Sequence, residues 1–164
     1  MKSSSELFVA DIIRAAKIDV KIGEWKEGAI PKATFPLIRN KLHLGRGWKW
    51  RVVTFGALGE QFVVLVAISL EKESYRATLA MKSAKTLKVL CFHELHTDHW
   101  NWHCHVIRGN VHETFPGVLR DKNLMSAWPA FAKRECSVPF DVTEDSALTV
   151  AAARYRFARG GGFL

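Results

Sequence analysis

The chain has 164 residues, a length that favours a single domain over residues 1–164 with a buried core of its own. Hydrophobic residues make up 48% and charged residues 24%, values that exclude a collagen-like or broadly disordered chain. The net charge of +8 favours an anionic partner, and nucleic acid is the usual one.

Three features bear on the compartment. Asp11 and Arg14 interrupt the first apolar stretch, so we do not expect it to be a secretion signal. The longest apolar run, Phe62 to Leu70, is too short to span a bilayer, and no membrane partner is expected. Three cysteines are an odd number and too few for a disulfide framework. We therefore expect a cytoplasmic protein, with its oligomeric state left open.

The first predicted element is a helix from Glu6 to Lys17, which Ser3 to Ser5 are placed to cap. Three apolar residues fall on one face of this helix: Phe8, Ile12 and Ala15. Residues 21–47 are rich in glycine and proline, which indicates loops with short elements.

A run of strands follows. Five segments are rich in β-branched, leucine or aromatic residues: 48–55, 61–70, 75–81, 86–96 and 100–108. The links between the first four are short, and short links favour antiparallel neighbours because a parallel crossover needs a dozen or more residues. The predicted fold is α+β: an antiparallel sheet of about five strands, a meander over residues 48–108, flanked by an N-terminal helix and C-terminal helices.

The C-terminal third is predicted to be mainly helical. Residues 117–136 have a helical pattern that Pro129 interrupts, and residues 138–142 resemble a short strand. Thr143 is placed to cap a last helix that runs to Arg159 and ends at a glycine run.

Five of the seven histidines lie between Cys91 and Gly109: His93, His96, His99, His103 and His105. Side chains alternate between the two faces of a strand, so a hairpin turn at residues 97–98 divides this segment. With a two- or four-residue loop, one face carries Glu94, His96, His103 and His105. The other face is mostly apolar and holds His93 as a polar exception.

This face has the composition of a metal site. His103 and His105 are two residues apart on one strand, with side-chain origins separated by roughly 6–7 Å. That spacing suits two ligands of one divalent ion, and His96 or Glu94 from the adjacent strand completes an open, catalytic type of site. The pattern leaves the metal open among Mn, Mg and Zn. Two alternatives remain open. The histidines lie on the surface of the hairpin and bind no ligand, or they bind an ion that has no biological role.

The segment resembles a motif of the HUH endonucleases, a superfamily of relaxases and rolling-circle replication initiators. The resemblance covers His96-x-Asp98-x4-His103-x-His105, about twelve residues. It implies an antiparallel sheet with flanking helices, and three histidines that hold a divalent metal against a phosphate of single-stranded DNA. Asp98 or Glu94 would then orient a histidine or add a ligand.

The resemblance also implies a nucleophilic tyrosine. Only Tyr155 is placed as in the initiators, downstream of the histidine pair, whereas relaxases carry the tyrosine near the N-terminus. Tyr155 also belongs to an apolar stripe of the last predicted helix, so a place in the core is the alternative.

Basic residues near aromatic ones are candidates for contacts with nucleic acid: Lys49, Arg51, Arg154, Arg156 and Arg159. The leading hypothesis is a metal-dependent enzyme that nicks or hydrolyses single-stranded DNA. Its rivals are a module that binds nucleic acid without cutting it, an accessory protein of a mobile element that binds another protein, and metal chemistry on a small molecule. Whether the chain is an enzyme therefore stays open at this point.

Overall fold

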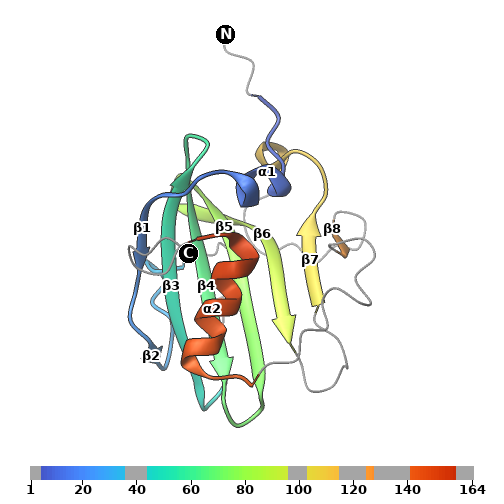
Figure 1. The fold of residues 1–164 in the computed structure, drawn as a ribbon. Coiled ribbons are helices and arrows are strands. Elements are labelled where there is room, and N and C mark those ends of the chain that lie inside the picture. Colours follow the sequence, from blue (N-terminus) through green and yellow to red (C-terminus); the bar gives the residue numbers. More distant parts are fainter. Residues whose placement is uncertain (1–4, 36–43, 96–102, 115–124, 128–140, 158–164) are drawn as a thin grey trace.

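A computed structural model describes residues 5–35, 44–95, 103–114, 125–127 and 141–157 (Figure 1). For residues 103, 104 and 125–127 it describes the backbone alone. The fold is α+β and mostly sheet, as predicted, with one helix before the main strands and one after them. Within these described residues the sheet is entirely antiparallel and has eight strands, more than the five or so predicted.

The strands are β1 (Ile18–Ile22), β2 (Lys26–Glu27), β3 (Trp48–Ala57), β4 (Glu60–Ser69), β5 (Ser74–Ser83), β6 (Thr86–Leu95), β7 (His103–Ile107) and β8 (Met125–Ala127). Their order is β1-β3-β4-β5-β6-β7-β8, and β2 pairs with β3. Strands β3 to β7 are the predicted meander. The helical prediction over residues 117–136 is wrong at β8, because pairing with the edge strand β7 overrides the local pattern there.

The N-terminal helix α1 (Val9–Arg14) is shorter than predicted. It starts after Phe8, which takes the N-cap position predicted for a serine, and the Phe8 N–H donates to the Asp11 carboxylate at 3.3 Å. Lys17 closes the other end, since its Nζ donates to the carbonyls of Ile12, Ile13 and Ala15. Phe8 is 40% exposed, so its predicted place on the buried face is wrong.

The C-terminal helix α2 (Glu144–Tyr155) begins as predicted, with the Thr143 hydroxyl accepting the Ser146 N–H at 3.0 Å. It ends at Arg156, which has a left-handed backbone (φ 55°), and not at Arg159. A single 3-10 turn (Val111–Glu113) follows β7. Among the residues that the structure describes, no helix is long and apolar enough to cross a membrane.

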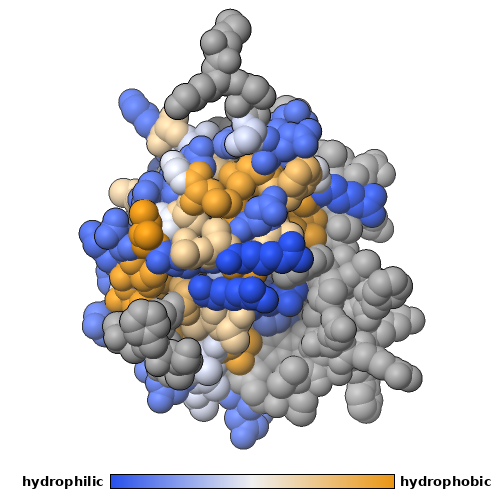
Figure 2. Space-filling model, turned by 45° about the horizontal axis from the view of Figure 1, so that its top comes forward, coloured by the Kyte–Doolittle hydropathy of each residue, from blue (hydrophilic) through white to orange (hydrophobic). Residues whose placement is uncertain are grey.

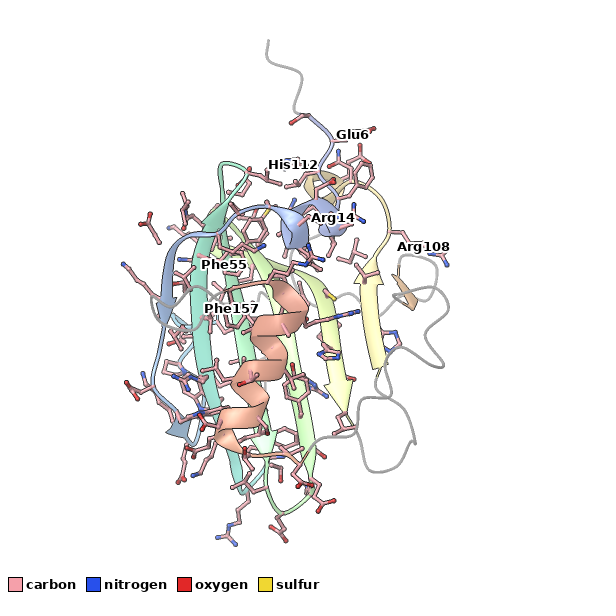
Figure 3. The ribbon with its side chains drawn as sticks, viewed as in Figure 1. Glu6, Arg14, Phe55, Arg108, His112 and Phe157 are labelled. Atoms are coloured by element: carbon pink, nitrogen blue, oxygen red, sulfur yellow. The ribbon has the colours of Figure 1, made fainter. Side chains whose placement is uncertain are left out.

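Helix α2 lies across one face of the sheet, over β3 to β5 (Figure 1). We call this the helix face. Its core includes Val66, Ala77 and Cys91 of the sheet and Tyr155 of α2. At the end of α2, Phe157 packs on Phe55 of β3 with ring centroids 6.5 Å apart (Figure 3).

The other face of the sheet has a second core. We call it the histidine face, because His105 lies on it. Its buried side chains include Trp50, Ala67 and Phe92, and the connection between β2 and β3 covers part of it through Phe35. Strand β4 is therefore buried on both faces from Phe62 to Ser69.

Outside these cores, hydrophilic side chains separate the apolar ones on the surface that Figure 2 displays. Four large apolar side chains of the described residues are exposed: Phe8, Ile18, Leu58 and Leu70.

A β-bulge in β6 decides which face the residues after it take. The register is Ala80 opposite Val89 and then Leu79 opposite Cys91, so Leu90 is the extra residue. Leu90 and Cys91 consequently both lie in the core of the helix face. Beyond the bulge, His93 is on the helix face and Glu94 is on the histidine face.

The turn between β3 and β4 contains an exposed leucine in a strained conformation. Leu58 and Gly59 both have positive φ (52° and 79°), as in the two-residue hairpin turns that favour Asn-Gly. Because Leu58 is 56% exposed, Leu58→Asn removes strain without loss of packing. We expect the free energy of unfolding, measured by urea denaturation, to rise by about 1 kcal/mol.

Leu70→Asn is the matched control, since Leu70 is 46% exposed and is not among the residues with positive φ. It should change stability by less than about 0.5 kcal/mol. Equal effects of the two substitutions would contradict an origin in backbone strain.

Candidate functional site

The register of β6 and β7 confirms the predicted division of the histidine hairpin at the strand positions that the structure describes. Glu94 lies opposite His103, and Phe92 lies opposite His105. The pleat therefore puts Glu94 and both histidine positions on the histidine face. Cys91 and His93 lie on the helix face, together with the β7 positions directly opposite them.

The site on the histidine face combines a buried carboxylate with an exposed imidazole. Glu94 is 7% exposed, while the side chain of His105 is exposed to solvent. Directly opposite residues in an antiparallel pair have Cβ atoms about 4.5–5.5 Å apart, so Glu94 and position 103 are near enough to share one ion.

Other predicted metal ligands fall outside the described residues. His96 and Asp98 belong to residues 96–102, and the structure describes only the backbone of His103. Within the described side chains, no group of three His, Cys, Asp or Glu residues could hold a metal ion. The three-histidine site therefore remains a prediction, whereas the shared face of its strand positions is an observation.

Glu94 has a partner that the sequence did not indicate. Its Oε1 lies 2.7 Å from Nε of Arg76 on β5, and their side chains are only 10% and 24% exposed. The two residues are directly opposite in the register, next to position 103. A straight row thus crosses five strands: Trp50, Ala67, Arg76, Glu94 and His103.

Both tyrosines of the chain are buried on the helix face. Tyr155, the predicted nucleophile, is 0% exposed, and its hydroxyl donates to the carbonyl of Ala77 at 2.7 Å. Tyr75 is 1% exposed and lies 3.2 Å from Nδ1 of His93, measured from its hydroxyl oxygen. The structure therefore gives Tyr155 the core position that its apolar stripe indicated, on the other side of the sheet from Glu94 and His105.

His93 is the polar exception of the helix face, as predicted. Its ring meets Tyr75 edge-on, with centroids 5.3 Å apart, and the residue is 7% exposed. Burial, helped by the positive charge of Arg154, lowers the pKa of His93 from 6.5 to about 3. His93 is thus a neutral residue at physiological pH and does not face the proposed metal ligands.

Two predicted nucleic-acid contacts on β3 have partners within the protein. Lys49 and Arg51 share the helix face, and Trp48 and Trp50 share the other, as strand alternation predicts. The ammonium of Lys49 donates to Glu144 at 2.7 Å, a hydrogen bond that raises the pKa of Lys49. Nε of Arg51 donates to the Gly23 carbonyl at 2.8 Å.

The basic residues at the end of α2 differ in their exposure to solvent. Arg154 is half-buried beside His93, and Arg156 is exposed at the left-handed position that ends the helix. Arg159 lies outside the described residues. Lys49, Arg51 and Arg154 are on the helix side of the sheet, so they do not extend the surface that carries Glu94 and His105.

Comparison with protein-family models, curated proteins and solved structures finds no match to this chain. A carboxylate, two histidine positions and a partly exposed guanidinium on one sheet face suit a divalent cation and an anionic oxygen held side by side.

Proposed function

We propose that this protein is a divalent-metal-dependent enzyme that cleaves nucleic acid, with single-stranded DNA as its substrate. The observation that carries the proposal is the register of β6 and β7, which puts Glu94, His103 and His105 on one face. His103 and His105 are the proposed ligands from β7. Glu94, and His96 and Asp98 of the hairpin, complete or orient the set.

The proposed reaction is hydrolysis, with water as the nucleophile. The HUH endonucleases use a tyrosine, but both tyrosines of this chain are buried on the helix face, away from His105. A divalent ion held by Glu94, His103 and His105 would activate a water molecule, so that hydrolysis would need no tyrosine. The net charge of +8 supports a polyanionic substrate.

The proposal predicts metal-dependent cleavage that both β7 histidines support. We expect wild-type protein to cut labelled single-stranded DNA in Mn²⁺ or Mg²⁺, and EDTA to stop the reaction. His103→Ala and His105→Ala should each lower the rate by about 100-fold or more, since each removes a ligand. Gel analysis of the products measures the cleavage rate, and calorimetric titration with Mn²⁺ measures metal binding.

His112→Ala is the matched control. His112 lies in the 3-10 turn beside α1, beyond the end of β7 opposite to its start (Figure 3). Its loss should change neither the cleavage rate nor Mn²⁺ binding. Cleavage that His103→Ala leaves intact, or no cleavage by wild type across varied sequences, overturns the proposal.

A non-catalytic nucleic-acid-binding module is the second candidate. One observation favours it: the ion pair with Arg76 competes with any metal for the Glu94 carboxylate. Binding that survives EDTA, without any cleavage product, distinguishes this module from the enzyme.

A further inference from the structure

We propose that Arg76 and Thr78 of β5 form an oxyanion-binding site on the histidine face, and that its ligand is a phosphate group of nucleic acid. The identity of the ligand rests on the function proposed above, whereas the anion site itself rests on contacts within the protein. Neither residue belongs to the histidine motif.

One buried hydroxyl on β5 lacks a hydrogen-bond partner, and it lies near a guanidinium with donors to spare. Oγ1 of Thr78 is inaccessible to solvent and has no hydrogen-bond partner among the described residues. Nε of Arg76 is also buried, but Oε1 of Glu94 lies 2.7 Å from it, so the ion pair occupies this nitrogen and only the terminal amino groups of Arg76 are offered to a second anion. Buried donors without partners are rare in folded proteins and commonly mark a place for a ligand, an ion or water.

These donors share one face and lie next to the proposed metal ligands. Arg76 and Thr78 are two residues apart on β5, so both point to the histidine face at a spacing of roughly 6–7 Å. Their rows across the sheet lead to the two histidine positions of β7. Across the sheet, Glu94 lies opposite Arg76, and His103 lies opposite Glu94. In the next row, Phe92 lies opposite Thr78, and His105 lies opposite Phe92.

The chemistry of the pair favours phosphate. A guanidinium has five N–H donors in a planar fork, so the ion pair with Glu94 leaves donors for a second anion. Glu94 holds Arg76 in place, which reduces the side-chain entropy lost on binding. The side chain of Arg76 is 24% exposed, so an anion can reach it from the surface.

The test uses a fluorescein-labelled oligothymidylate in EDTA, so that binding is measured without cleavage. Because Arg76→Gln alone strands a buried carboxylate, the principal variant is the double substitution Arg76→Gln with Glu94→Gln. We expect this variant to bind about tenfold more weakly. The slope of log affinity against log salt should fall by about 0.7, the value for one phosphate contact on a single strand.

Thr78→Val supplies a second and independent variant. It should bind more weakly by about three- to tenfold, and its thermal unfolding temperature should not fall, because the substitution removes a buried hydroxyl without a partner. Arg108→Gln is the control for charge, since Arg108 is exposed at the far end of β7 from His103 (Figure 3). It should change affinity by less than about twofold.

The outcomes separate this inference from the proposed function. If both β5 variants fold and keep the affinity and the salt slope of wild type, the oxyanion site is wrong, even if metal-dependent cleavage is found. Weakened binding in both variants, in a protein that never cleaves DNA, supports the site and rejects the enzyme. Weakened binding by Arg108→Gln to the same extent also overturns the site, because it indicates general attraction by positive charge.

Discussion

Truncation of Tyr155 to alanine is expected to lower the free energy of unfolding by about 3–5 kcal/mol, because it empties a large volume in the core. Tyr155 is 0% exposed and packs with the helix-face cluster under α2. Tyr155→Phe keeps the ring and loses the hydrogen bond that the hydroxyl donates to the Ala77 carbonyl. That variant should lose about 1 kcal/mol. Urea denaturation measures both values.

The same two variants decide between a core tyrosine and a nucleophile. We expect Tyr155→Phe to keep any metal-dependent DNA cleavage within about twofold of wild type, because water is the proposed nucleophile. Thr149→Ala, at an exposed position of α2, is the control for a change in the helix itself and should lose less than about 0.5 kcal/mol. A Tyr155→Phe variant that folds normally and cleaves nothing would restore the tyrosine mechanism of the HUH endonucleases.

The main sheet was predictable from the sequence because its strands carry strong local signals. Strands β3 to β6 are runs of β-branched and aromatic residues, and turns such as Leu58–Gly59 are short enough to require antiparallel neighbours. Strand β1 also carries a signal, because Ile18, Val20 and Ile22 alternate with charged residues, so it too was predictable. Strands β2 and β8 carry no such signal. They have two and three residues, and their pairing with β3 and β7 gives them their conformation.

The face division of the hairpin was also predictable, since it depends only on alternation along β6 and β7. The partner of Glu94 was not. Counting back from the turn between β5 and β6, where Ser83 pairs with Thr86, would put Arg76 opposite His93. The bulge at Leu90 shifts the register by one residue and brings Arg76 opposite Glu94. A bulge leaves no reliable mark in composition or periodicity, so the ion pair required the structure.

The stability of the protein is expected to fall steeply with acid because of His93. The pKa of His93 is about 3 in the folded protein and 6.5 when the side chain is unperturbed. Between these values the unfolded chain binds the proton and the folded one does not, so stability is lost as pH falls from about 6.5 toward 3. Between pH 7 and pH 5 this one group should remove about 2 kcal/mol.

The measurement is urea denaturation at several pH values, compared with His93→Gln. Glutamine has no titrating group and can still bond to the Tyr75 hydroxyl, so this variant should lose about 2 kcal/mol less than wild type between pH 7 and pH 5. His112→Gln removes an imidazole outside the buried pair and should follow the wild-type profile. Parallel profiles for wild type and His93→Gln would show that His93 accepts a proton without unfolding. In that case the imidazole would have access to water, and the contact with Tyr75 on the helix face would be open to solvent and no longer part of a closed core.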